Sequence, residues 1–554
     1  MIRTITLIFG LLFLISCGKD TQTTIFHNVN GYSNTPAGLI TFNAIAVSEG
    51  KVLETGSREA LLESYPEAVL IDGEGNTMLP GLIDAHAHVM GLGDAILNVN
   101  LMGLTSLEGT LETVAGYASE YGDLEWISGR GWNQVLWEEN RFPTAAELDR
   151  AVSDRPVWLS RVDGHAGWAN TRALEIAGIT RDTPDPDGGA IIRDENGDAT
   201  GVFIDRAMGL IRRHIPEQDD QYRATALEAA LEEIRRMGMT GVHDAGTDVE
   251  AFKLMKQFAD DGKLTARIYG MIRGSGEVFD ELSADGPVIG YAGDRLYLRS
   301  VKLYSDGALG SRGAALIEDY SDDPGNRGLL FNDADEFTQM IGKVVSKGYQ
   351  AGVHAIGDRG NRTVLDAFAN VRELHGDRGL RHRIEHSQIV NLDDIPRFKE
   401  LDIIASMQPT HATSDMNMAE DRVGPVRIRG AYAWRTFLDQ GTVIAAGSDF
   451  PVELSNPFHG LYSAVTRADH EGNPQGGWYP EQILTREEAL HGFTLGAAYA
   501  GHMEDVVGSL EPGKWADFIL IDRDYFEVPE DEIWQIRVLE TWLAGERVYQ
   551  AGTY

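Results

Sequence analysis

Cysteine is almost absent from this sequence: Cys17 is the only one among 554 residues. An internal disulfide is therefore excluded. Basic residues are also few, because 48 Lys and Arg stand against 85 Asp and Glu, giving a formal net charge of −37. Nucleic acid and anionic lipid would both be repelled by such a chain, so neither is expected as a binding partner.

Long apolar runs are scarce as well. Residues 4–15 form one, but it is too short to span a bilayer. It follows the positive start MIR and closes on LISC at Cys17, a pattern that resembles a bacterial lipoprotein signal over residues 1–17. A plain secretory peptide and a short anchor helix are the alternatives.

The lipoprotein resemblance implies cleavage before Cys17 and acylation of that residue. Cys17 would then be unavailable as a metal ligand. The domain would be held by lipid to the bacterial cell envelope, outside the cytoplasm. Gly18 after the cysteine points to the outer membrane and periplasm if the cell has two membranes.

The length suits one large domain with a smaller satellite. Residues 23–79 and 501–554 are both rich in β-branched residues broken by Gly and Asn, which is typical of short strands and turns. These two flanks surround a long α/β middle. We therefore expect both chain ends to build one small β-sandwich.

The middle, residues 80–500, repeats a helical stretch, a short apolar strand and a polar tip. Eight such strands are expected, within residues 78–88, 238–246, 266–274, 299–307, 349–358, 381–388, 403–411 and 442–450. Helical patterns such as TALEAALEEIRRM and EFTQMIGKVVSKG separate them. The fold class predicted is α/β, a (β/α)8 TIM barrel, with an insert of about residues 124–206 after the first strand.

The first barrel strand ends in His86-Ala87-His88. Because side chains on a strand alternate, the two imidazoles would point the same way and could bind one metal ion. An HxH triplet by itself is weak evidence, since most histidine pairs are ordinary core or surface residues.

Other metal-binding residue types fall at further strand tips: Lys302, His354, His386 and Asp449. Active sites of such barrels lie where the strands end. Taken singly, His354 and His386 could be hydrogen-bonded core histidines, and Asp449 could be a helix N-cap. Their joint placement favours a metal site.

Lys302 could act in two ways. A lysine desolvated inside a barrel has a lowered pKa, and its amine can take up CO2 to form a carbamate able to bridge two metals. The alternative is a buried lysine paired with a carboxylate, for which Asp306 is a candidate.

Six motifs now carry a family resemblance: PGLIDAHAH, VKLYSDG, GVHAIGD, RIEHSQ, GSDFPVE and GSLEPGKWADFILID. They resemble the amidohydrolase superfamily, and more narrowly its YtcJ-like branch (amidohydrolase family 3), which includes N-substituted formamide deformylases. DGHAGWANTRAL and GAYAWRTFLDQG also match that branch. The likeness covers nearly everything after the signal segment.

The resemblance implies a ligand set for two divalent metals, with zinc expected first. His86 and His88 would bind one ion, His354 and His386 the other, and carboxylated Lys302 would bridge them. Asp449 would bind metal and act as general base and acid while metal-bound hydroxide attacks a carbonyl.

Substrate contacts are harder to predict. We name Trp132, His165, His243, Arg312 and His411 as candidates, the first two from the insert. Arg130 and the insert tryptophans Trp137, Trp158 and Trp168 could also face the pocket, although tryptophans more often serve in packing.

The leading prediction is a metal-dependent hydrolase of non-peptide carbon–nitrogen bonds, acting on a small N-substituted amide or formamide. The first alternative keeps the site and changes the bond, to an ester, a lactone or an acyl-amino acid. The second is a metal-binding surface lipoprotein without turnover. A homodimer is a family-level expectation only.

Overall fold

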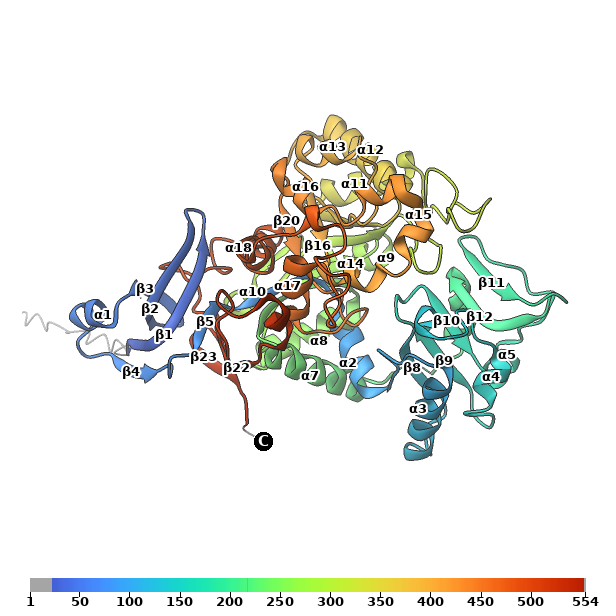
Figure 1. The fold of residues 1–554 in the computed structure, drawn as a ribbon, viewed down its shortest axis with the longest axis horizontal. Coiled ribbons are helices and arrows are strands. Elements are labelled where there is room, and N and C mark those ends of the chain that lie inside the picture. The colour runs from blue at the N-terminus through green and yellow to red at the C-terminus, as the bar shows by residue number, and fades with distance from the viewer. Residues whose placement is uncertain (1–21, 217, 553–554) are drawn as a thin grey trace, which may run out of the picture.

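The computed structural model describes residues 22–216 and 218–552, so the predicted signal segment and lipidation site, Cys17, lie outside the described residues. Three units follow one another along the long axis of the molecule (Figure 1): a β-sheet containing both chain ends, a central barrel, and a second sheet from an insert.

Eight parallel strands form the barrel, in the spatial order of the sequence. They are β6 (Leu82–Ala87), β13 (Met239–Thr247), β14 (Arg267–Arg273), β16 (Leu296–Tyr304), β17 (Gln350–Ala355), β18 (Arg383–His386), β19 (Ile404–Met407) and β20 (Ile444–Ala446). Each overlaps one predicted segment, so the eight-stranded α/β barrel is confirmed. The described strands β20 and β6 share no ladder, but the N–H of Asp449 donates to the carbonyl of His86 over 2.8 Å and brings these two edges together.

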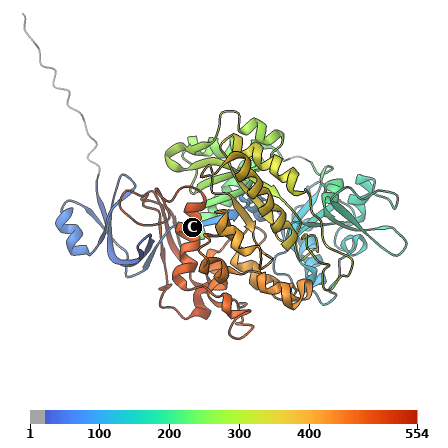
Figure 2. The ribbon, with the colours of Figure 1, turned by 90° about the horizontal axis from the view of Figure 1, so that it is seen from above.

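Helices surround the barrel, as Figure 2 shows from above. Those connecting its strands are α2 (Val89–Leu97), α7 (Asp220–Arg236), α8 (Val249–Asp260), α9 (Glu277–Leu282), α10 (Tyr291–Asp294), α11 (Ala334–Ser346), α12 (Asp358–His375), α13 (Ile395–Glu400), α14 (Pro409–Asp415), α15 (Ala419–Arg427) and α16 (Trp434–Asp439). After β20 come α17 (Pro457–Thr466), α18 (Arg486–His491) and α19 (Ala497–Ala500). No helix among the described residues is long and apolar enough to cross a membrane.

The strand pattern decides which side chains face the barrel interior. On β16, Val301 and Leu303 pack in one buried cluster with Phe337 and Ile341 of α11. Because neighbouring side chains on a strand point to opposite faces, Lys302 between them points inward. Because Val301 and Leu303 pack outward against α11, the Lys302 amine between them is directed into the barrel.

The insert forms a six-stranded sheet between β6 and β13. Its strands are β7 (Val99–Asn100), β8 (Ile127–Trp132), β9 (Val157–Arg161), β10 (Ala166–Ala169), β11 (Gly189–Arg193) and β12 (Ala199–Asp205), and its helices are α3 (Leu107–Glu120), α4 (Ala145–Asp149), α5 (Thr171–Ala177) and α6 (Gly209–Arg212). The predicted start at residue 124 is too late, because β7 pairs with β8 and α3 packs into the same apolar cluster.

Both chain ends contribute to a single further sheet, in the order β23-β22-β21-β5-β1-β2-β3 with β4 beside β1. Its members are β1 (Thr24–Thr35), β2 (Gly38–Ser48), β3 (Lys51–Gly56), β4 (Val69–Asp72), β5 (Thr77–Pro80), β21 (Phe518–Ile521), β22 (Val538–Leu543) and β23 (Glu546–Gln550), with α1 (Arg58–Ser64) after β3. The predicted meeting of the two ends is observed. A sandwich of two separate sheets is not confirmed.

That sheet bends over its own core. The ring centroids of Phe26 on β1 and Trp542 on β22 lie 4.8 Å apart, although β5 and β21 separate their strands. Three strand spacings span roughly 14 Å in a flat sheet. The sheet must therefore curl so that its two ends share one apolar cluster.

Candidate functional site

The metal-binding residue types gather at the C-terminal ends of the barrel strands. His86, Lys302, His354 and His386 lie in the last residues of β6, β16, β17 and β18. His88 follows β6 as the N-cap of α2, and Asp449 follows β20. The structure thus brings together the six residues predicted to bind metal, with His88 one position beyond the strand.

Asp449 stands where the imidazoles converge. Its Oδ1 lies 3.1 Å from His88 Nε2 and 3.6 Å from His86 Nε2, and its Oδ2 lies 3.7 Å from His411 Nε2. One donor atom each from His86, His386 and Asp449 fall within 4.8 Å of one another. Asp449 Oδ1 is buried yet has no hydrogen bond of good geometry. Nitrogen and oxygen donors aimed at one point fit a divalent cation.

Protonation states also suit a metal. Burial, and next the charge of Lys302, lowers the pKa of His86 to about 4. Burial likewise holds the pKa values of His354 and His386 well below the usual range for histidine. Burial alone would raise the pKa of Asp449, but His88, His86 and His386 outweigh it and lower the pKa well below the usual range. Neutral imidazoles and an ionised carboxylate are the forms that bind metal.

Lys302 is fully buried, and burial lowers the pKa of its amine to about 8. Nζ lies 2.9 Å from His86 Nε2. Asp306, the candidate ion-pair partner, instead accepts hydrogen bonds from the backbone N–H groups of Ala315, Ile356 and Gly357. The amine is thus near the candidate ligands and away from that carboxylate.

Two of these residues have a strained backbone. His386 has φ +74° and Asp449 has φ +62°, both in the left-handed region that non-glycine residues rarely adopt. Such conformations cost about 1–3 kcal/mol each and concentrate at functional sites. The rest of the fold must offset this cost in order to hold the two side chains in their orientations.

A buried network orients His86. Its Nδ1 lies 2.5 Å from Glu385 Oε2, which leaves Nε2 to face Lys302 and Asp449. Arg383 holds Glu385 as an ion pair, with Nε 2.6 Å from Oε1, and also donates to His243 Nδ1 over 2.8 Å. Sequence reasoning missed Glu385, although a charged residue inside RIEH was a visible signal.

Asp84 fixes the Asp449 loop against β6. It accepts hydrogen bonds from Ser448 Oγ over 2.6 Å and from the Ser448 N–H over 3.0 Å. Burial raises the pKa of Asp84 to about 7. This residue, also missed from the sequence, connects the first and last barrel strands.

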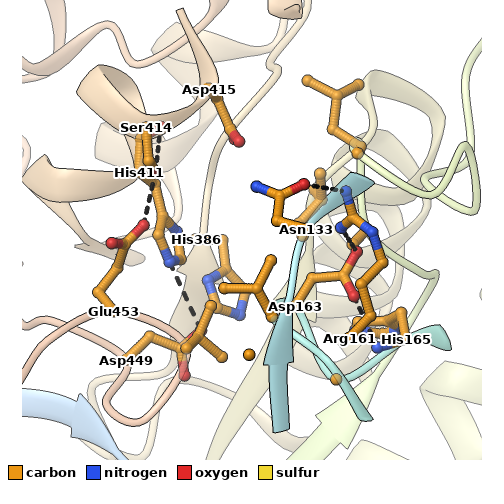
Figure 3. A pocket seen from close by; sticks show the side chains of 18 of the residues that line it. Asn133, Arg161, Asp163, His165, His386, His411, Ser414, Asp415, Asp449 and Glu453 are labelled. Atoms are coloured by element: carbon orange, nitrogen blue, oxygen red, sulfur yellow. Dashed lines mark hydrogen bonds and ion pairs between the residues drawn. The ribbon is translucent and has the colours of Figure 1, made fainter. Parts of the chain in front are cut away.

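A cavity of about 540 Å³ opens above these groups and has two walls. The barrel wall contains every candidate ligand except His86, together with Tyr304, His411, Asp415 and Glu453. The insert wall comes from segments around Arg130 and Arg161. Figure 3 shows Asn133, Arg161, Asp163 and His165 facing His386, His411 and Asp449.

The predicted substrate contacts divide. His165 and His411 line the cavity. Trp132 does not, because it is fully buried in the insert core and its indole N–H donates to the Leu159 carbonyl over 2.8 Å. His243 lies beneath the site, bound to Arg383. Arg312 pairs with Asp322, Nη2 to Oδ2 3.0 Å, away from the cavity lining.

The insert tryptophans belong to packing. Trp137 and Trp168 lie 6.2 and 6.1 Å from Trp132, centroid to centroid, and Trp158 packs 6.2 Å from Phe203. They stiffen the insert and do not line the cavity.

Two pairs of polar residues in the cavity had no recognisable signal in the sequence. Arg161 pairs with Asp163, Nη1 to Oδ2 2.6 Å, on the insert wall. On the barrel wall, Ser414 donates to Glu453 Oε1 over 2.5 Å. Arg161 ends β9 and Ser414 lies on α14, and a polar residue in an element gives no sign of which site it will face. Only the fold reveals that these residues line the cavity.

Comparison with solved structures defines the class. The crystal structure of an uncharacterised metal-dependent hydrolase from Pyrococcus horikoshii OT3 superposes with a TM-score of 0.74 at 28% identity, covering 92% of this chain and 99% of that one. The fold of this chain is thus shared with a metal-dependent hydrolase.

Sequence comparison gives the family. Residues 69–549 match the model of the amidohydrolase family, and the chain belongs to that family. It is 34% identical over 521 residues to YtcJ of Bacillus subtilis (strain 168), named as an amidohydrolase, with 92% of this chain and 96% of that protein covered. It is 27% identical over 529 residues to the N-substituted formamide deformylase of Arthrobacter pascens, covering 92% and 95%. The protein is therefore a hydrolytic enzyme of this family.

Proposed function

We propose that this enzyme hydrolyses a non-peptide carbon–nitrogen bond, in an N-substituted amide or formamide. The observation that carries the proposal is the convergence of His86, His88 and His386 on the Asp449 carboxylate at the floor of a cavity of about 540 Å³. The formamide deformylase among its relatives supports the choice of bond.

Two divalent ions, zinc by preference, would be held by His86, His88, carboxylated Lys302, His354, His386 and Asp449. Bound there, they would acidify water and polarise a carbonyl. The lowered pKa of the buried Lys302 amine supports carbamate formation, because the neutral amine is the form that reacts with CO2.

Asp449 would move the proton. Held ionised by His88, His86 and His386, its carboxylate accepts a proton from the attacking water. It then gives this proton to the nitrogen as the carbon–nitrogen bond breaks. His411 Nε2, buried at the cavity and without a hydrogen-bond partner in the described structure, is placed to donate to the substrate.

The ligand set is tested by measuring the metal content of the chain from Gly18 onward, in the wild type and in Lys302→Ala. About two metals per wild-type chain and clearly fewer in the variant are expected. An unchanged metal content in Lys302→Ala would contradict the role of carboxylated Lys302 as a metal ligand. A wild-type chain that takes up no metal on reconstitution would contradict the proposal of a metal-dependent catalytic centre.

Turnover is tested with a panel of N-substituted formamides, amides, esters and lactones. Asp449→Asn is expected to lower kcat by about 10²–10⁴-fold on the best amide. Hydrolysis confined to esters or lactones would overturn the proposed bond.

We also propose that the enzyme is lipid-anchored in the cell envelope through Cys17, on the strength of the LISC pattern. Labelled palmitate should enter the full chain but not Cys17→Ser. Equal labelling, or none in either, would contradict the anchor.

A further inference from the structure

The insert wall of the cavity carries two arginines in different states. Arg161 is neutralised: Nη1 lies 2.6 Å from Asp163 Oδ2, Nε donates to Gln134 over 2.8 Å, and Nη2 donates to Asn133 over 2.9 Å. Its charge is paired, and each of its three side-chain nitrogens has an acceptor within the protein. Arg161 therefore serves to shape this wall.

Arg130, on β8, has no such partner. Its one side-chain hydrogen bond within the described structure runs from Nη2 to the Val162 carbonyl, 2.9 Å. Nε is buried without an acceptor, and no described Asp or Glu lies within ion-pair distance. The side chain nevertheless lines the same cavity as His88 and Asp449.

A guanidinium in this state is costly, because a desolvated charge without a counter-ion in direct contact is unfavourable. Burial lowers the pKa of Arg130 to about 10, although the charges of Asp449, Asp163 and Asp94 act against this from beyond ion-pair distance, so at neutral pH it stays charged. A ligand anion would offset that cost. A carboxylate fits best, since its two oxygens match the paired N–H groups of the guanidinium fork.

The residues of the opposite wall indicate how the substrate is oriented in the cavity. Asp415 and Glu453 line the barrel side, and no Lys or Arg among the described residues lies within ion-pair distance of either. Burial raises the pKa of both carboxyls, so this wall offers an anionic group no positive charge, whereas Arg130 attracts it. Exposed Leu136 and Leu454, both on the cavity, offer contacts to an apolar substituent.

We propose that the substrate is an N-substituted amide that also carries a carboxylate and an apolar side chain, with Arg130 binding the carboxylate. This inference rests on the proposed function. For an N-formyl amino acid, water adds its oxygen to the formyl carbon, the carbon–nitrogen bond breaks, and the nitrogen receives a proton. The products are formate and the amino acid.

A matched pair of probes isolates the carboxylate. N-formyl-DL-leucine and N-(3-methylbutyl)formamide differ only by that group. The metal-loaded enzyme should show a kcat/KM at least about tenfold higher for N-formylleucine. Arg130→Gln should raise KM for N-formylleucine by at least about tenfold with little change in kcat, and leave the neutral formamide within about twofold. Arg130→Lys should fall between, because it keeps the charge and loses the fork.

Arg172→Gln is the matched control, since Arg172 is an exposed arginine on the same insert, paired with Glu175. Metal content and thermal unfolding of each variant verify the fold. Equal kcat/KM for the two probes, or equal losses on both in Arg130→Gln, would overturn the inference and leave the proposed function intact.

Calorimetric titration separates the two proposals if neither probe is hydrolysed. Binding of N-formylleucine that Arg130→Gln abolishes and Arg172→Gln does not would support the carboxylate site while contradicting formamide hydrolysis. No binding of N-formylleucine to the wild type would overturn the inference.

Discussion

Glu385 acts on the site through His86. Its carboxylate fixes the ring nitrogen that does not face Asp449, and Arg383 in turn fixes the carboxylate. Both Glu385 and His86 are fully buried, so no water competes for these contacts. Such outer partners set the tautomer and direction of a metal-binding imidazole.

Glu385→Gln should therefore weaken metal binding by about 10–100-fold, because an amide holds the imidazole less firmly than a carboxylate. Competition with a chelator of known affinity measures the change. Glu373→Gln, at an exposed position of α12, is the control. Equal affinity in Glu385→Gln and the wild type would show that the contact does not orient His86.

At this scale the sequence supports some predictions and not others. The residues at strand tips could be predicted, because an imidazole or amine inside an apolar strand is conspicuous. Glu385 and Asp84 are likewise charged residues inside apolar strands, and the sequence prediction did not include them. Trp132 was named wrongly as a contact, since aromatic residues fill cores as readily as pockets. Arg130 could be suspected but not separated from other candidates, because the sequence does not show that no described carboxylate lies within ion-pair distance of it.

Between elements, Arg435 of α16 and Glu488 of α18 form a paired contact. Nη1 lies 2.7 Å from Oε1, and Nη2 pairs with Oε2. Glu488 also accepts the Thr485 N–H over 2.8 Å in a capping box. Chiefly through Arg435, the pKa of Glu488 is lowered to about 2.

The sign of the pH dependence follows from that depressed pKa. The stabilisation is present above the ordinary pKa of 4.5 and is lost as pH falls toward about 2. Glu488→Gln should cost about 1 kcal/mol at pH 7, a modest amount because the pair is partly exposed. Its deficit relative to wild type should shrink as pH falls below about 4.5.

Urea unfolding of both proteins between pH 7 and 3 measures this convergence. Glu487→Gln, the exposed neighbour in the same helical turn, is the control for the helix dipole. A deficit that stays constant over the whole range would contradict a role for the ionised carboxylate.

The barrel strands could be predicted because each combines an apolar run with a polar tip and a helical pattern on either side. The start of the insert could not. β7 is two residues long and has no recognisable alternation, and α3 resembles any barrel helix until its packing against Ile127 and Trp132 is known. A strand this short can be recognised only by the strand with which it pairs.

Across the whole molecule, Arg267 connects the barrel to the terminal sheet. It begins β14, and its Nε and Nη2 donate to the two oxygens of Asp517, just before β21, over 2.7 and 2.9 Å. Both side chains are almost fully buried. Paired, they are satisfied, but either one alone would be a buried unpaired charge.

Arg267→Ala should lower the free energy of unfolding by about 3–5 kcal/mol, since Asp517 would stay buried without its partner. The double variant Arg267→Ala/Asp517→Ala should lose less than the two single losses added together. Chemical unfolding of the four proteins measures the coupling. Strictly additive losses would show that the two units are not held by this pair.

Because both chain ends contribute to one sheet, that sheet can be completed only late in synthesis. β5 hydrogen-bonds to β21, a strand the ribosome makes only after the entire barrel. Until then β5 presents an unpaired edge, the kind of surface on which chains aggregate. Synthesis must therefore reach almost its last residues before the sheet can assemble, and a chain released early would be left with that edge open.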